Sequence, residues 1–196
     1  LTRAGEVIAP PPASAWLAPA SPSTGEGTVF LGGGSLGSPV IADVVAAART
    51  VDASKKARLV VLGGGASSSS LTSAYAQAVK KAGWVGQVNA VGHTGKGWPG
   101  TSLAGATAVV LVGEDPVALA SSMADPAFRA TVTQAVRTTP VVFADGSMTA
   151  VLGERWSAKA RPTSSTLEAE GVAAYRADDA LWQFGLALVP ATVVPH

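Results

Sequence analysis

Residues 140–153 have the sequence PVVFADGSMTAVLG, and they carry most of the information on how this chain folds. The stretch Pro140–Ala144 is a short apolar run, which predicts a buried strand. We expect a sharp turn at residues 145–147 and a helix over Met148–Trp156. A serine in such a strand–turn–helix junction lies above the edge of a sheet, where the helix N-terminus stabilises negative charge. The stretch therefore indicates a nucleophile elbow.

The same alternation of short apolar strands and helices extends through the rest of the chain. The predicted strands are Thr28–Leu31, Arg58–Leu62, Val85–Val91, Ala106–Val112, Pro140–Ala144 and Leu186–Val194. The predicted helices are Val40–Ala48, Ser70–Ala82, Val117–Met123, Pro126–Val136, Met148–Trp156 and Asp179–Phe184. Fully apolar strands that alternate with helices are typical of a parallel sheet covered on both faces. We therefore expect one α/β domain over residues 26–196, with a doubly wound, mostly parallel sheet.

Composition excludes several classes of protein. Charged residues are 14% of the 196 residues, hydrophobic residues are 47%, and the formal net charge is +1, so the chain is not disordered. Basic residues form no run longer than two, and we expect no nucleic-acid partner. Cysteine is absent and there are two histidines, so we expect no metal and no disulfide. No apolar stretch approaches the roughly 18 residues of a membrane-spanning helix.

Residues 1–25 differ from the rest of the chain. Five prolines lie between Pro10 and Pro22, mixed with alanine and serine, and this composition favours an extended arm. Such a leader suits an exported protein of the periplasm, the cell surface or the medium. The alternative is that the segment reflects only where the sequence was cut. The low charge fits a subunit of a larger assembly, or simply an alanine- and glycine-rich composition.

Two glycine-rich stretches resemble nucleotide-binding motifs. Residues 32–37 match GxGxxG, but the acid at the right distance, Asp52, precedes the strand that it should follow. Residues 92–97 resemble a phosphate-binding loop, but the residue after Lys96 is glycine instead of serine or threonine. We interpret the first stretch as the turn after a strand and the second as a surface loop. No cofactor is expected.

Ser147 is the candidate nucleophile at the predicted elbow. Only His93 and His196 could be histidine bases, and only His196 follows a predicted strand of the sheet. Glu168 or Glu170 could be the acid that orients the base. The alternative is that the serine, or the aspartate before it, only caps the helix that follows.

Four stretches of the chain carry a resemblance to a known family. They are TVFLGGG at 28–34, AVVLVGEDPVAL at 108–119, DGSMTAVLG at 145–153 and GLALVPATVVPH at 185–196. In this order they resemble the first strand and glycine turn, the GGDQ turn, the GTSAGAAVMG elbow and the GLGLLPGVIVDQH strand of cyanophycinase and peptidase family S51. The resemblance spans residues 27–196 and implies a class I glutamine amidotransferase-like fold.

The resemblance implies a serine peptidase that hydrolyses β-aspartyl or related peptide bonds. Ser147 would be the nucleophile, His196 the base and Glu168 the orienting acid. The oxyanion and substrate loops would contain Gly33, Gly34, Asp115 and Gly146.

This chain departs from the family pattern in three places. Pro116 stands where the family has the glutamine of GGDQ, and an alignment of the elbow without a gap puts Gly146 at the nucleophile position. A shift of one residue restores Ser147 to that position but spoils the match that follows. The family also continues past the strand that ends at His196, so we expect the C-terminal part of the fold to be missing from this chain. We expect a second fragment or other subunits to complete it. The alternative function is an inactive structural or binding subunit of a cell-surface complex.

Overall fold

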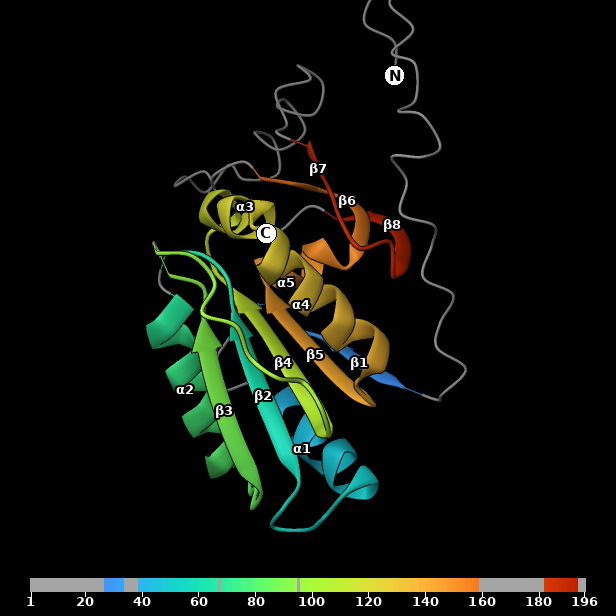
Figure 1. The fold of residues 1–196 in the computed structure, drawn as a ribbon. Helices are drawn as coiled ribbons and strands as arrows, with labels where there is room; N and C mark the ends of the chain where they lie inside the picture. The colour runs from blue at the N-terminus through green and yellow to red at the C-terminus, as the bar shows by residue number, and fades with distance from the viewer. Residues whose placement is uncertain (1–26, 34–38, 67, 95, 159–181, 194–196) are drawn as a thin grey trace, which may run out of the picture.

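The structure is a computed structural model that describes residues 27–33, 39–66, 68–94, 96–158 and 182–193 (Figure 1). The predicted arm over residues 1–25 lies outside the described residues, and so do four of the candidate site residues, Gly34, Glu168, Glu170 and His196.

Five strands form one sheet in which every neighbouring pair is parallel. They are β1 (Thr28–Leu31), β2 (Arg58–Gly63), β3 (Gln87–Gly92), β4 (Ala106–Gly113) and β5 (Val141–Gly146). Their order across the sheet is β1-β5-β4-β2-β3, so the chain crosses over between non-adjacent positions. This topology confirms the predicted doubly wound α/β class.

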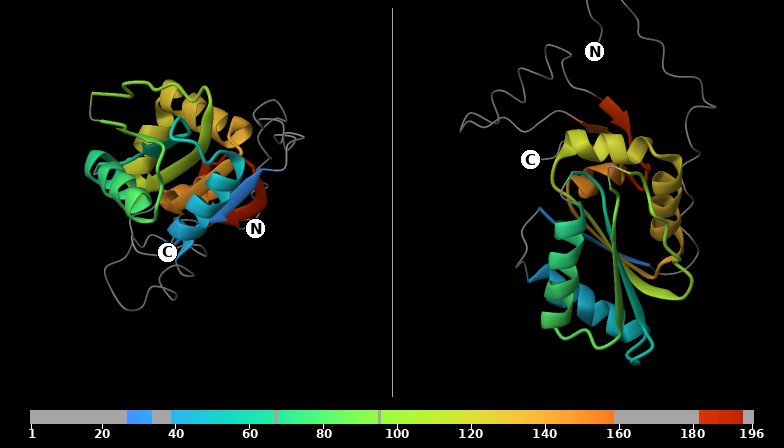
Figure 2. Two further views of the ribbon diagram at one scale, coloured as in Figure 1. Left: turned by 90° about the horizontal axis from the view of Figure 1, so that it is seen from below. Right: turned by 60° about the vertical axis from the view of Figure 1, so that its left-hand side comes forward.

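Helices cover both faces of this sheet (Figure 2). The helices are α1 (Val40–Val51), α2 (Ser68–Lys81), α3 (Pro116–Ala124), α4 (Pro126–Thr138) and α5 (Ser147–Val151). The first two pack against one face, and the other three contribute to the core on the opposite face. Within the part of the chain that the structure describes, we find no helix with the length and apolar character that a membrane crossing requires.

The central strands are apolar throughout because both of their faces are buried. Every residue of β4 is buried, and its side chains alternate between the two cores. Val109 and Leu111 pack beneath α3 and α4, whereas Val110 packs beneath α1 and α2. Each such side chain stabilises the fold by roughly 1.5–3 kcal/mol through removal from water. The same pattern that predicted the strands thus also accounts for their position in the sheet.

The predicted helix over Met148–Trp156 is wrong after its first turn. Helix α5 ends at Val151, and the chain continues as strand β6 (Gly153–Ser157). The reason is tertiary, because the N–H groups of Leu186, Leu188 and Ala187 donate to the carbonyl oxygens of residues 151, 152 and 153, respectively. A continuing helix would need those same carbonyl groups for its own hydrogen bonds.

The predicted helix over Asp179–Phe184 is also wrong where the structure describes it. Residues Trp182–Phe184 form strand β7, which pairs with β6 in the antiparallel sense. Strand β8 (Val189–Val193), which lies within the predicted strand at 186–194, pairs with β6 in the parallel sense. The aromatic residues at 182 and 184 alternate with a glutamine, which is a strand pattern rather than a helical one.

Candidate functional site

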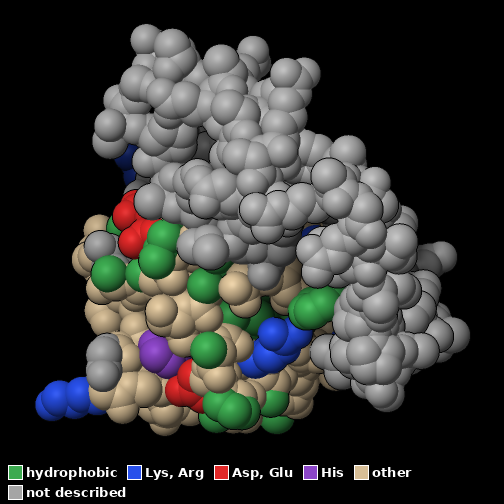
Figure 3. Space-filling view, turned by 90° about the horizontal axis from the view of Figure 1, so that it is seen from above, with side chains coloured by type: hydrophobic (Ala, Val, Ile, Leu, Met, Phe, Trp, Pro, Cys, Tyr) green, Lys and Arg blue, Asp and Glu red, His purple; other side chains and the backbone are tan. Residues whose placement is uncertain are grey.

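The carboxyl ends of β1, β4 and β5 meet at one edge of the sheet. Leu31 lies beside Ala144, and Gly113 lies beside Gly146. The Gly32 N–H donates to the carbonyl oxygen of Ala144 at 2.8 Å, so the pairing of β1 with β5 extends into the glycine turn. Seen from this end in Figure 3, the described surface carries only scattered charged side chains among apolar and polar ones.

The sharp turn of the elbow is made by Gly146. Its backbone angles are φ 61° and ψ −138°, and helix α5 begins at the next residue. Side-chain-bearing residues rarely adopt such angles, because the β-carbon crowds the backbone. In a nucleophile elbow the strained residue between strand and helix is the one that carries the nucleophile. In this chain that position is occupied by glycine, which agrees with the alignment of the elbow without a gap.

Ser147 is buried immediately after the turn. Its side chain has no exposed surface, and its hydroxyl donates to the carbonyl oxygen of Glu114 at 2.8 Å. We expected an accessible nucleophile at this residue, and the geometry does not support that expectation. Instead, the hydroxyl links the first turn of α5 to the end of β4.

Asp145 is a buried carboxylate directly before the elbow, and only 2% of it is exposed. The Tyr75 hydroxyl from α2 donates to its Oδ2, and the Gly146 N–H donates to its Oδ1 at 2.9 Å. Burial raises the pKa of Tyr75, and the hydrogen bond and negative charge of Asp145 raise that pKa further. Tyr75 is therefore a phenol donor at any physiological pH, and it satisfies an acid that would otherwise be costly to bury.

The glycine turn after β1 closes against this acid. A β-carbon at Gly32 would collide with the Asp145 carboxylate and would lie 2.9 Å from the Phe143 ring. The Thr149 hydroxyl of α5 lies 2.9 Å from the carbonyl oxygens of both Gly32 and Ala144, and it can donate its proton to either. A β-carbon at the exposed Gly33 would meet no atom within 4 Å. The elbow is thus tightly packed at Gly32 and open at Gly33.

Asp115 lies at the same edge, after β4, and it serves as a helix cap. Its Oδ1 accepts a hydrogen bond from the Val117 N–H at 2.9 Å, and Pro116 begins α3. Pro116, the residue at which the chain departs from the GGDQ pattern, is buried. The structure therefore brings Gly33, Asp115, Gly146 and Ser147 to one edge.

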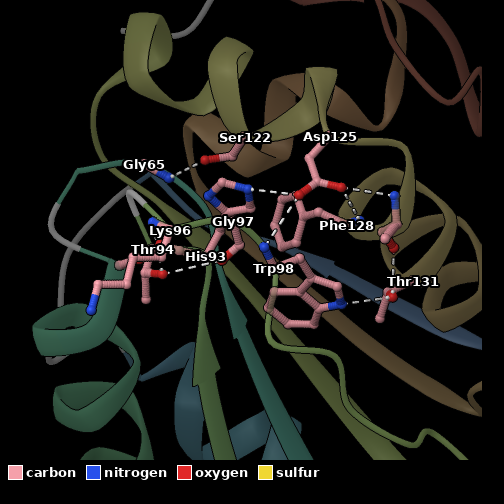
Figure 4. Close-up of polar contacts among 12 residues, drawn as sticks. Gly65, His93, Thr94, Lys96, Gly97, Trp98, Ser122, Asp125, Phe128 and Thr131 are labelled. Carbon is pink, nitrogen blue, oxygen red and sulfur yellow. Dashed lines mark hydrogen bonds and ion pairs between the residues drawn. The ribbon is translucent and has the colours of Figure 1, made fainter.

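A second polar cluster, which the sequence did not predict, centres on Asp125 (Figure 4). Its Oδ1 accepts from the N–H groups of Ala127 at 2.9 Å and Phe128 at 3.3 Å, which caps α4. Its Oδ2 lies 3.2 Å from the His93 Nε2 and accepts from the Trp98 N–H at 3.2 Å. Desolvation raises the pKa of Asp125, but these hydrogen bonds outweigh it and hold the pKa below its ordinary value.

Aromatic contacts join this cluster to α4. The rings of His93 and Trp98 pack edge-on against Phe128, with centroids 5.4 and 5.0 Å away. The Trp98 indole N–H donates to the Thr131 hydroxyl at 3.1 Å (Figure 4). The connection between β3 and β4 is thereby fixed against α4. A histidine beside a carboxylate is also the arrangement of a general base; here the same carboxylate caps α4 through Oδ1 and faces His93 through Oδ2.

Sequence reasoning could have found part of these two clusters. An aspartate at the end of an apolar strand, as at Asp145, needs a buried partner, and an Asp-Pro pair, as at Asp125, is a helix-start signal. Neither signal identifies Tyr75 or His93 as the partner. Among the described residues, no three histidine or acidic side chains are grouped as metal ligands.

Compared with the profiles of known protein families, the chain matches none, and no curated protein is similar enough to count as a relative.

We predict that Gly146→Ala lowers the free energy of unfolding by about 1–3 kcal/mol, because alanine is strained at a positive φ. Urea denaturation followed by circular dichroism measures the change. Gly33→Ala is the matched control, since its β-carbon meets nothing within 4 Å, and we expect a change within about 0.5 kcal/mol. Equal effects of the two substitutions would contradict the strained elbow.

We predict that Asp125→Asn is most destabilising at neutral pH and that its effect shrinks in acid. The folded pKa of Asp125 lies below its ordinary value of 3.8, so its ionised form stabilises the protein above that pH. This stabilisation is lost as the pH falls below the ordinary value and through the lower pKa of the folded protein. Urea denaturation from neutral to acid pH measures the difference from wild type.

Thr131→Val is the control for this experiment. It removes the acceptor of the Trp98 indole N–H in the same cluster without changing a titratable group, so its effect should not depend on pH. A constant difference between wild type and Asp125→Asn from neutral to acid pH would contradict the proposed role of the carboxylate.

Proposed function

We propose that this chain is a catalytically inactive relative of cyanophycinase and the S51 peptidases, acting as a structural or binding subunit of an exported, cell-surface assembly. The observation that carries the proposal is the glycine at the strained position of the elbow. Export rests on the proline-, alanine- and serine-rich composition of residues 1–25.

Acyl transfer needs an exposed nucleophile within hydrogen-bond reach of a base. Gly146 has no side chain that could attack a carbonyl group. Ser147, the next residue, is fully buried, and its proton is donated to a main-chain carbonyl rather than to a base. Attack by Ser147 would require this hydrogen bond to break and the first turn of α5 to rotate. Loss of catalysis is therefore the simplest account of the elbow.

The contacts around the elbow suit a structural role. Tyr75 on α2 holds Asp145 at the end of β5, and Thr149 on α5 contacts the carbonyl oxygen of Gly32 after β1. The turn thus connects elements from both faces of the sheet. A backbone shape that suits catalysis serves here to position helix α5 over the core.

The second candidate function is an active hydrolase of β-aspartyl peptides. The observation that favours it is the elbow itself, because the strand, the strained turn and the helix are all present. In that version Ser147 is released from Glu114 on substrate binding, with His196 as base and Glu168 as orienting acid.

Labelling with a fluorophosphonate probe separates the two functions. We expect no labelling of the native chain or of Ser147→Ala, alongside an active serine hydrolase that confirms the probe. We also expect Ser147→Ala to lower the free energy of unfolding by about 1 kcal/mol, because it removes the hydrogen bond that the buried Ser147 hydroxyl donates. Ser121→Ala, at an exposed serine of α3, should have almost no effect on stability. Labelling of the native chain that is lost in Ser147→Ala would overturn the proposal.

A further inference from the structure

Strand β1 is an edge of the five-stranded sheet. Among the strands that the structure describes it pairs with β5 alone, and two of its apolar side chains are exposed, Val29 by 43% and Leu31 by 49%. The opposite edge is β3, where the Asn89 side-chain amide donates to the Thr101 hydroxyl of the following connection at 2.9 Å. The following connection therefore contacts the β3 edge through a side chain, whereas two apolar side chains of the β1 edge are exposed.

The backbone of β1 has hydrogen-bonding groups that point away from the sheet. In a parallel pair, alternate residues face the partner strand, and here the N–H groups of Thr28 and Gly32 donate to β5 and its flanking residue. Val29 and Leu31 therefore direct their N–H and C=O groups outward. Within the described ranges, no hydrogen bond to these outward groups is recorded.

β1 also lacks the features that keep edge strands from pairing. Proteins usually protect an edge with charged side chains, proline or a bulge. The sequence of β1 is TVFL, which has no charge and no proline, and its register with β5 is regular. A strand of this kind can form hydrogen bonds with another strand. We therefore expect its pairing partner to be an uncharged, extended segment.

We propose that a second copy of this chain occupies this edge, so that two β1 strands pair in antiparallel fashion across a two-fold axis. With Phe30 at the axis, Val29 lies opposite Leu31 of the partner subunit. Both residues direct their backbone groups outward, so each such pair exchanges both of its hydrogen bonds. The two five-stranded sheets then become one continuous sheet.

The side chains in this register are complementary to themselves. Val29 and Leu31 lie beside Val142 and Ala144, on the face of the sheet that carries α4. Phe30 lies on the other face. A two-fold axis perpendicular to the sheet keeps each face on its own side, so apolar side chains meet apolar side chains on both faces.

The charges of α1 fit the same two-fold axis. This helix packs against β5 and β1, with Asp43 exposed in its first turn and Arg49 exposed in its last turn. The axis makes α1 antiparallel to its counterpart, so the acidic end of each helix is on the side of the basic end of the other. The net charge of +1 adds little repulsion between the copies.

Sedimentation velocity of the full chain over a range of concentrations tests the proposal. We expect a monomer–dimer equilibrium that Val29→Lys weakens by about tenfold or more, because it brings two charges into an apolar contact. Leu31→Pro should weaken it similarly, because proline removes an outward N–H and leaves the pairing with β5 intact. Val85→Lys is the matched control, since Val85 is 55% exposed away from this edge, and it should leave the equilibrium unchanged.

Three results would overturn the proposal. The first is a monomer at every soluble concentration. The second is a dimer that Val29→Lys and Val85→Lys affect equally. The third is slow hydrogen exchange at Val29 and Leu31 in the monomer, which would mean that another part of this chain covers the edge. If Leu31→Pro does not fold, Val29→Lys decides. None of these outcomes depends on whether the elbow is catalytically active.

Discussion

The backbone conformation of Gly146 is the constraint on which the carboxyl edge of the sheet depends. Parallel pairing brings the ends of β1, β4 and β5 together, and the chain must then leave β5 for α5 within a single residue. At φ 61° glycine makes this turn without the strain that any other residue would carry. The glycine that permits the turn also removes the side chain that would act there as a nucleophile. The unstrained turn and the proposed loss of catalysis therefore have the same cause, a glycine at this position.

Two carboxylates secure the ends of the strands around this turn. Asp145 is buried and takes a phenol proton from Tyr75, while Asp125 accepts hydrogen bonds from three N–H groups and lies 3.2 Å from His93. Each joins segments that are distant in sequence. Acidic groups at the carboxyl end of a parallel sheet often indicate a reaction. Here their hydrogen bonds account for them as parts of the framework, which agrees with a scaffold or binding role.

The sequence predicted the fold well where burial alone decides the structure. The apolar runs at 58–62 and 106–112 form central strands that are buried on both faces. They could be predicted because a continuous run of apolar residues indicates a buried strand. The prediction of secondary structure was wrong where the structure depends on a segment that is distant in the sequence. The chain after Val151 is a strand because residues 186–188 take its carbonyl groups, and local sequence does not contain that information. For the same reason Tyr75, which lies 70 residues before Asp145, was not found.

A crystal structure at a resolution that defines peptide orientations tests the central claim most directly. We expect Gly146 at a positive φ and the Ser147 hydroxyl within hydrogen-bond distance of the Glu114 carbonyl oxygen, out of contact with solvent. A structure with Ser147 at the strained position and its hydroxyl facing solvent beside a histidine would contradict the account.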